Sequence, residues 1–151
     1  MRIILILLIL SQCSIKNEQS EWETIFNGKN LDGWTVKIKG YPSGDNFGNT
    51  FKVVDEAIQV SYENYDNFDF KFGHIYYTEK KYKNYHLKLE YKFFGNQAIG
   101  GEGWATKNSG IMFHSQHPET MLIDQSFPVS LEAQFLGGLG DGKRPTGNLC
   151  T

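Results

Sequence analysis

The chain lacks three features that mark common classes of protein. It has no block of basic residues, and its 15 Lys and Arg nearly balance its 17 Asp and Glu. A nucleic-acid-binding protein needs a concentrated positive surface, so this balance argues against such a partner. The sequence also contains no internal repeat and no segment that sustains a helical period of apolar residues. Its 151 residues therefore predict one domain with almost no helix.

Long apolar runs are missing too, except at the start of the chain. Ile3–Leu10 is apolar throughout, follows the basic start Met1-Arg2 and is itself followed by polar residues. Such a run is too short to span a bilayer core of ~30 Å as a helix, and the arrangement is typical of a secretory signal. We therefore expect residues 1–20 to form a signal and a polar tether, and residues 21–151 to form the exported domain.

The end of this signal predicts a lipid anchor. Leu10-Ser11-Gln12-Cys13 resembles a bacterial lipobox, whose cysteine is lipidated and becomes the mature N-terminus. Gln12 departs from the small residue usual before that cysteine, and the alternative is an ordinary signal that is cleaved nearby with loss of Cys13. The pattern favours lipidation at Cys13, which predicts an exported bacterial protein, either periplasmic or anchored to a membrane by its lipid.

Cysteine is scarce, since the chain has only Cys13 and Cys150. If Cys13 is lipidated or removed, Cys150 has no partner within the chain, although exported proteins can form disulfides. Either Cys150 is a buried free thiol, or its partner lies beyond Thr151. The second alternative predicts a chain that stops partway through its domain.

Aromatic residues and glycine are abundant, with 11 Phe, 8 Tyr, 3 Trp and 16 Gly. Aromatic side chains fill the cores of β-proteins, and their rings can also cover the apolar faces of sugars. Short strands separated by turn residues predict an all-β sandwich or jelly roll. The expected strands before the site region are 35–39, 51–54, 57–60, 73–78 and 85–93, with 51–54 and 57–60 forming a hairpin around Asp55-Glu56.

The strand 85–93 has the clearest alternation. Its odd-numbered residues are predicted to face the core and its even-numbered residues to face out; these are Tyr85, Leu87, Leu89, Tyr91 and Phe93 against His86, Lys88, Glu90 and Lys92. Glu90 is either a substrate-binding carboxylate or a solvated charge between two lysines.

The stretch Lys107–Gly138 carries the strongest functional signal. Two strand-like segments place their polar residues on one face by a period of two: Asn108, Gly110, Met112 and His114 in the first, and Ser130, Glu132 and Gln134 in the second. Their apolar partners, Ile111, Phe113, Leu131, Ala133 and Phe135, take the opposite face. A face with a carboxylate, amides and an imidazole suits a ligand better than bulk water, so we predict a functional site here.

Four motifs in order resemble those of the 3-keto-disaccharide hydrolase domain family of bacteria. They are the opening Phe26–Trp34 (FNGKNLDGW), the strand Tyr82–Tyr91, the signature Asn108–Ile111 (NSGI) and the pair Glu132-x-Gln134. The resemblance covers about residues 22–151. It implies a concanavalin A-like jelly-roll β-sandwich whose concave sheet binds sugar. It also implies that the C-terminal residues lead into further strands, so that the sandwich is incomplete at its C-terminus.

The resemblance implies a substrate and a reaction. The substrate is a glycoside oxidised to a ketone at C3, which acidifies the hydrogen at C2. A base can then remove that hydrogen, the C1 substituent leaves, and water adds back. We expect Glu132 and His114 to transfer protons, without a metal or a cofactor. The expected substrate-binding residues are Asn108, Gln134, Glu90, Trp104 and His117.

Several of these residues have a structural alternative. Glu132 could hold loop amides, His114 could be a satisfied hydrogen-bonding histidine, and Trp104 could pack under its own loop. His117, beside a proline, could be an ordinary loop residue. A metal site formed by His114, His117 and Asp124 is conceivable, but the spacing of these residues matches no strong ligand signature.

Two positions depart from the family pattern. His114 stands where much of the family has an arginine, and Leu136-Gly137-Gly138 stands where many members have an aspartate. Both departures fall at the predicted site, so they bear on which groups transfer protons.

Two alternative functions use the same fold. A retaining β-glucanase needs two carboxyl groups ~5–5.5 Å apart. Here Glu132 is followed at alternate positions by Gln134 and Leu136, which argues against that reaction. A non-catalytic carbohydrate-binding module is the remaining alternative, because fold alone does not imply activity.

Overall fold

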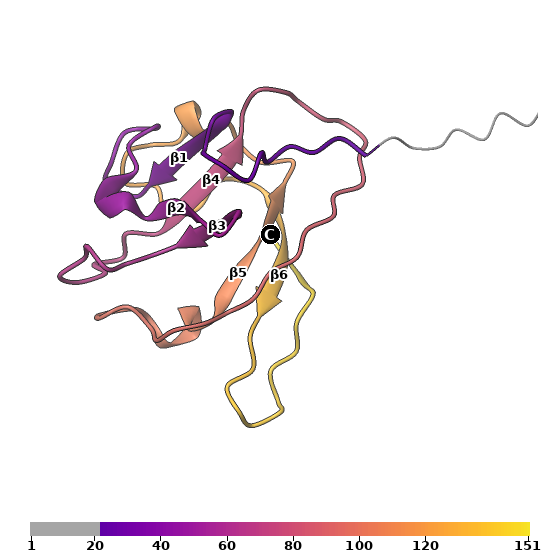
Figure 1. The fold of residues 1–151 in the computed structure, drawn as a ribbon. Coiled ribbons are helices and arrows are strands. Elements are labelled where there is room, and N and C mark those ends of the chain that lie inside the picture. Colours follow the sequence, from indigo (N-terminus) through magenta and orange to yellow (C-terminus); the bar gives the residue numbers. More distant parts are fainter. Residues whose placement is uncertain (1–21) are drawn as a thin grey trace, which may run out of the picture.

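The computed structural model describes residues 22–151 and shows an all-β protein (Figure 1). Its strands are β1 (Trp34–Ile38), β2 (Phe51–Val54), β3 (Ala57–Val60), β4 (Gly73–Tyr77), β5 (Asn108–Phe113), β6 (Leu131–Leu136) and β7 (Asn148–Cys150). The helices of this part of the chain are the short 3-10 turns η1 (Phe47–Asn49), η2 (Gly103–Ala105) and η3 (Pro118–Thr120). The predicted all-β class is confirmed. The predicted signal, the tether and Cys13 lie outside the described residues.

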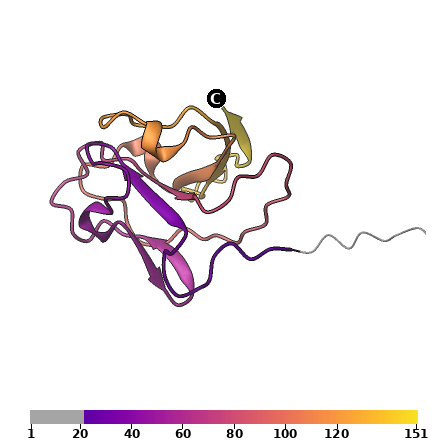
Figure 2. The same ribbon diagram turned by 90° about the horizontal axis from the view of Figure 1, so that it is seen from above.

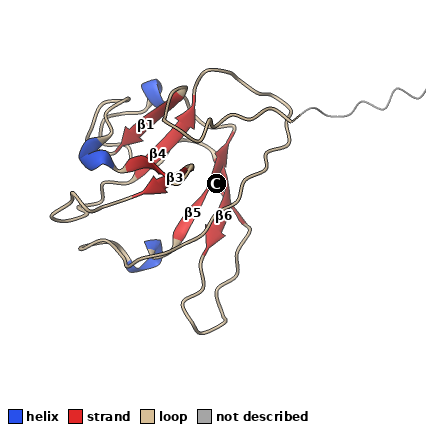
Figure 3. Ribbon diagram, viewed as in Figure 1, coloured by secondary structure: helices blue, strands red, loops and turns tan. Residues whose placement is uncertain are grey.

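The strands form three small antiparallel sheets, β1–β4, β2–β3 and β5–β6–β7. Seen from above, β5–β6–β7 lies on one side of the molecule and the two N-terminal sheets lie on the other (Figure 2). Long loops join the strands (Figure 3). Antiparallel sheets in separate layers agree with the predicted jelly-roll sandwich. The described part of the chain holds no helix with the length and apolar character of a membrane span.

The predicted hairpin is confirmed at both strands. Phe51 pairs with Val60 and Val54 with Ala57, so the turn consists of Asp55 and Glu56. Both turn residues have positive φ, 48° and 59°. This conformation gives a two-residue turn the twist that antiparallel strands need.

The most buried apolar cluster lies between the two N-terminal sheets. Val36 and Ile38 of β1 pack with Phe51 of β2, and all three are at most 5 % exposed. The partly buried residues around them are Leu31, Tyr41, Phe47, Ile58 and Ile75. Because side chains alternate along β1, Thr35 and Lys37 point to the opposite side of that sheet.

Residues 85–93, predicted to be the clearest strand, form no ladder. Residues 79–97 make no backbone hydrogen bond with any described residue. The side chains predicted to be buried, from Tyr85 to Tyr91, are 42–51 % exposed. The segment nevertheless contacts the apolar face of β5–β6–β7, where Tyr91 stacks on Phe135 with ring centroids 4.3 Å apart. The alternation identified the inner side chains, but a buried strand also requires hydrogen-bonded neighbours, and this prediction was therefore wrong.

Candidate functional site

The register of β5–β6–β7 brings the predicted polar residues together. Glu132 of β6 pairs with Met112 of β5 and with Cys150 of β7. Gln134 pairs in the same way with Gly110 and with Asn148. Paired residues lie on the same face of a sheet. We call this set the polar face; it consists of Asn108, Gly110, Met112, Glu132, Gln134, Asn148 and Cys150.

The contribution of β7 to the polar face was missed by the sequence analysis. Asn148 and Cys150 belong to a strand of three residues, which is too short to show a convincing alternation. Cys150 is half-buried and forms no disulfide within the described residues. Its position opposite Glu132 makes the thiol a neighbour of the predicted catalytic carboxyl group.

Glu132 lies directly over Gly110. A Cβ atom at Gly110 would come within 2.7 Å of Glu132 Cγ and would collide with its Oε1 atom. Partial burial raises the pKa of the Glu132 carboxyl group above its ordinary value. Within the described residues, no group donates a hydrogen bond to this carboxylate. It is therefore a partly desolvated carboxylate whose oxygens are available to a ligand.

Three amide side chains form a row on the polar face. Asn148 Nδ2 donates to Gln134 Oε1 at 3.1 Å, and Gln134 Nε2 donates to Asn108 Oδ1 at 3.3 Å. Asn108 Nδ2 in turn donates to the carbonyl of Trp104 at 3.3 Å. Each amide nitrogen carries two hydrogens, so Asn108 and Gln134 both retain a donor for a ligand oxygen. The row fixes which end of each amide faces which neighbour.

Trp104 forms an aromatic platform with two other residues. Its ring stacks on Phe72, with centroids 5.6 Å apart and planes 26° apart, and Phe127 lies 4.9 Å from Phe72. Trp104 is 54 % exposed. It is therefore supported by a neighbour without being packed under its own loop. A supported, exposed indole of this kind can stack against a sugar ring.

Arg144 connects this platform to the end of β6. Its guanidinium donates to the carbonyls of Trp104, Thr106 and Gly137. The three acceptors belong to the η2 turn, the residue that follows it and the residue after β6. Arg144 was not singled out in the sequence, where nothing local distinguishes it from other loop cations.

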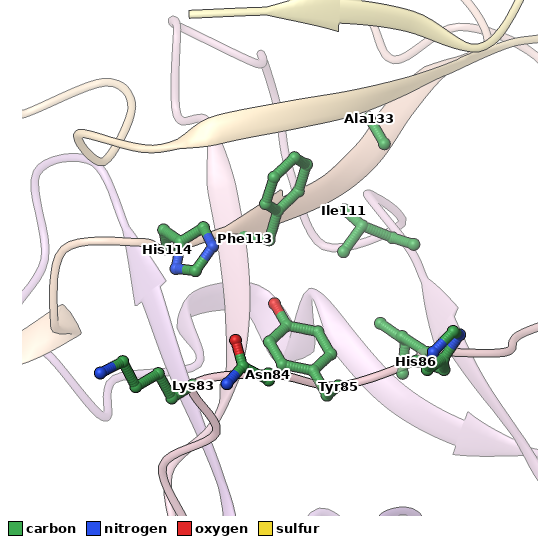
Figure 4. Close-up of a pocket in the computed structure, with 9 residues that line it drawn as sticks. Lys83, Asn84, Tyr85, His86, Ile111, Phe113, His114 and Ala133 are labelled. Carbon is green, nitrogen blue, oxygen red and sulfur yellow. The ribbon is translucent and has the colours of Figure 1, made fainter.

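His114 does not lie on the polar face. It follows β5 with φ of 51°, and this left-handed conformation ends the alternation of the strand. Its ring instead lines a cavity of about 500 Å³ together with Ile111, Phe113 and Ala133, against residues 83–87 (Figure 4). Those three residues belong to the apolar face of the sheet, opposite Glu132. The prediction that His114 and Glu132 share a face was therefore wrong.

Glu90 and His117 also lie apart from Glu132. Glu90 is exposed on residues 85–93, which contact the opposite, apolar face of the sheet. His117 immediately precedes η3, and its Nδ1 atom lies 3.9 Å from a carboxylate oxygen of Glu119. Among residues 22–151, no group of three His, Cys, Asp or Glu side chains is placed to hold a metal ion.

Two polar side chains that sequence reasoning did not single out, the buried Lys37 and the partly buried His74, fix the loop before β6. Lys37 is 1 % exposed, and its Nζ atom donates to the carbonyls of Ile38, Tyr41 and Ile123 at 2.9–3.0 Å. Its partner in the β1–β4 ladder, His74, bonds the carbonyl of Ser126 at 2.9 Å. Burial lowers the pKa of His74, so the ring is neutral and donates its Nε2 hydrogen. Both side chains thereby hold the loop that leads into the strand of Glu132.

Comparison with protein families gives one finding. Residues 21–151 match the 3-keto-alpha-glucoside-1,2-lyase-like domain. No curated protein matches the chain, and no solved structure matches it.

Proposed function

The chain belongs to the family of the 3-keto-alpha-glucoside-1,2-lyase-like domain, and from this membership we propose that it cleaves glycosides that carry a ketone at C3. The family is one of carbohydrate-active enzyme-like domains. The polar face, with its carboxylate and amides, and the neighbouring aromatic platform supply the groups that a sugar substrate requires.

The observation that carries this proposal is the state of Glu132. Its carboxylate is partly buried, has a raised pKa and accepts no hydrogen bond from a described residue. A carboxylate with a raised pKa is a stronger base than one in water, and a general base must have its oxygens available to the proton it removes. Glu132 meets both requirements on a face that also offers amide donors.

In the proposed reaction, Glu132 removes the hydrogen at C2, and the electron pair passes into the C3 ketone to give an enolate. Amide hydrogens of Asn108 and Gln134 stabilise the enolate oxygen. The enolate then re-forms the ketone while the C1–oxygen bond breaks, which leaves a double bond between C1 and C2. Glu132, now protonated, returns its proton to the departing oxygen. Addition of water across the double bond completes a net hydrolysis.

The test compares 3-keto-glycosides with their parent glycosides. The proposal expects cleavage of the keto form alone, because only the ketone acidifies the hydrogen at C2. Glu132→Gln keeps the size of the side chain and removes the base, so turnover should fall by at least about 100-fold. Near-normal turnover in this variant would exclude Glu132 as the base. Binding of the keto-sugar by the wild-type protein without turnover would instead support a carbohydrate-binding module.

We also propose that the protein is exported and carries a lipid at Cys13. The support is the sequence alone: a basic start, the apolar run Ile3–Leu10 and the lipobox-like residues up to Cys13. Labelling with a radioactive fatty acid in a bacterial host should mark the wild-type protein and leave Cys13→Ala unmarked. Equal labelling of both would exclude lipidation at this residue.

A further inference from the structure

The amide row of the polar face has a direction. Asn148 donates to Gln134 Oε1 at 3.1 Å, Gln134 donates to Asn108 Oδ1 at 3.3 Å, and Asn108 donates to the carbonyl of Trp104. These three bonds all point from β7 toward the η2 turn. Because each amide has already used a particular part of its hydrogen-bonding capacity, the row offers different groups to a ligand at its two ends.

Asn148 can only accept a hydrogen bond from a ligand. One hydrogen of its Nδ2 atom goes to Gln134 and the other to the carbonyl of Pro145, 3.4 Å away, so both are in use. Its Oδ1 atom accepts no hydrogen bond from residues 22–151. The residue is half-buried on the polar face. A ligand that covers this oxygen must therefore bring a hydrogen-bond donor, such as a hydroxyl group.

Gln134 offers the complementary group beside Asn148. The two residues pair across β6 and β7, which places their Cβ atoms about 4.5–5.5 Å apart on the same face. The Nε2 atom of Gln134 keeps one hydrogen after its bond to Asn108. A hydrogen-bond donor for a ligand and a hydrogen-bond acceptor for a ligand are thus neighbours.

We propose that Asn148 sets the specificity of the site by accepting a hydrogen bond from a hydroxyl group on a carbon next to the ketone. This inference rests on the proposed function, in which Asn108 and Gln134 bind the ketone oxygen. In a 3-keto-glycoside the ketone carbon has two neighbours, C2 and C4, and either can carry this hydroxyl group. Gln134 and Asn148 together then bind an α-hydroxy ketone, with the ketone oxygen on the donor and the hydroxyl on the acceptor.

This arrangement discriminates between closely similar ligands. If hydrogen replaces the hydroxyl group, the Oδ1 atom of Asn148 is covered by the ligand and left without a partner. A site that hydrogen-bonds a substrate hydroxyl rejects the analogue that lacks it for this reason. Asn148 therefore selects the substrate by binding it, and Glu132 remains the group that transfers the proton.

Asn148 also positions Gln134 through its Nδ2 atom, and this second role must be separated from the first. Asn148→Ala removes the donors and the acceptor together. Asn148→Asp removes the donors and keeps an acceptor oxygen. If Asn148 only positioned Gln134, the two variants would bind ligands alike. If its oxygen accepts from the hydroxyl group, only the aspartate variant keeps the discrimination.

The test measures binding by calorimetry with a keto-sugar that cannot be cleaved. The probe is the 3-ketone of 1,5-anhydroglucitol, which has no leaving group at C1, and it is compared with its 2-deoxy and 4-deoxy analogues. The wild-type protein should bind one of these analogues about ten-fold more weakly than the probe, and the position of the loss identifies the hydroxyl group.

The variants show whether Asn148 causes that difference. Asn148→Ala should bind the probe and the weaker analogue equally, and Asn148→Asp should keep the difference between them. Asn64→Ala is the control, because it loses a single exposed amide bond, to the carbonyl of Gly48 in η1, and leaves the polar face intact. It should keep the wild-type difference.

Four results would overturn the proposal. They are wild-type protein that binds none of the three ligands, equal binding of all three by the wild-type protein, a difference that persists in Asn148→Ala, and loss of the difference in both variants of Asn148. The proposed function fails separately, if the protein binds the probe with the expected preference but leaves 3-keto-glycosides intact. Cleavage of 3-keto-glycosides without any preference for the hydroxyl group would refute the role of Asn148 alone.

Discussion

At the scale of single residues, the contact between Gly110 and Glu132 decides where the carboxylate lies. Gly110 has an ordinary negative φ, so its role here is the space left by a missing side chain. Glu132 uses that space, and its oxygens remain free of described hydrogen-bond donors. The glycine of the NSGI signature is therefore explained by the space that the Glu132 side chain occupies.

Gly110→Ala should displace Glu132 without removing it. The new Cβ atom would lie 2.7 Å from Glu132 Cγ, so the side chain must move to another rotamer. We expect a large fall in kcat with a smaller change in KM, and a loss of stability of ~1–3 kcal/mol from overpacking. Kinetics and chemical denaturation measure both effects. Gly138→Ala is the matched control, because its Cβ would meet nothing within 4 Å. Equal kinetics in the two variants would contradict the assigned role.

The raised pKa of Glu132 predicts a pH profile. If Glu132 is the base, kcat/KM should rise with pH as its carboxyl group loses a proton. Because burial raises that pKa, the rise should be centred above the ordinary value of 4.5. A pH–rate series on the 3-keto-glycoside measures it. An acid limb that persists unchanged in the residual activity of Glu132→Gln would assign the titration to another group.

At the scale of elements, Arg144 joins the turn of Trp104 to the sheet of Glu132. One guanidinium serves three carbonyl groups, from Trp104, Thr106 and Gly137. The amide row reaches the same turn through Asn108. The platform and the polar face are thus held in a fixed relation by two independent hydrogen-bonded connections.

Arg144→Met should loosen this connection and leave Glu132 in place. Loss of hydrogen bonds from a charged donor should cost ~1.5–3 kcal/mol of stability. Trp104 fluorescence should shift, and KM for the sugar should rise more than kcat falls. Lys143→Met removes a neighbouring positive charge without these contacts and serves as the control. The assignment would be contradicted if Lys143→Met gave the same fluorescence shift.

At the scale of the whole molecule, Lys37 and His74 connect the N-terminal sheets to the loop before β6. Their bonds to Ile123 and Ser126 cross between segments far apart in the sequence. Lys37 is buried and His74 is partly buried, so each depends on its hydrogen bonds for stability. The Lys37 ammonium has its three donors satisfied by carbonyl groups.

His74 should make the stability of the protein depend on pH. Its pKa in the folded state lies below the ordinary value of 6.5 because of burial. The unfolded chain therefore binds the proton first as pH falls, and stability should decrease below about pH 6.5, by at most about 1.4 kcal/mol per pH unit.

Urea denaturation between about pH 5 and pH 8 measures this slope. His74→Gln cannot titrate and should lose His74's share of it. The exposed His117→Gln should keep the slope of the wild-type protein. The assignment fails if His74→Gln retains the full slope.

Local features were predictable and non-local ones were not. The hairpin β2–β3 was predicted correctly because its strands are adjacent and its turn is set by two residues, Asp55 and Glu56. The prediction of a buried strand at residues 85–93 was wrong, because a strand needs hydrogen-bonded neighbours and the alternation of side chains does not show which segments those are. His114 was placed on the wrong face, because a single positive φ ends the period of two. The catalytic and binding roles assigned from the sequence stay predictions.

The sequence by itself determined the all-β class, the family and the shared face of Asn108, Glu132 and Gln134. Those properties follow from composition, motifs and the two-residue repeat of a strand, all of which are local. Only the tertiary structure decided that Cys150 lies beside Glu132, that His114 lies on the opposite face and that Lys37 is buried. These depend on register and on contacts between distant segments, which no local pattern specifies.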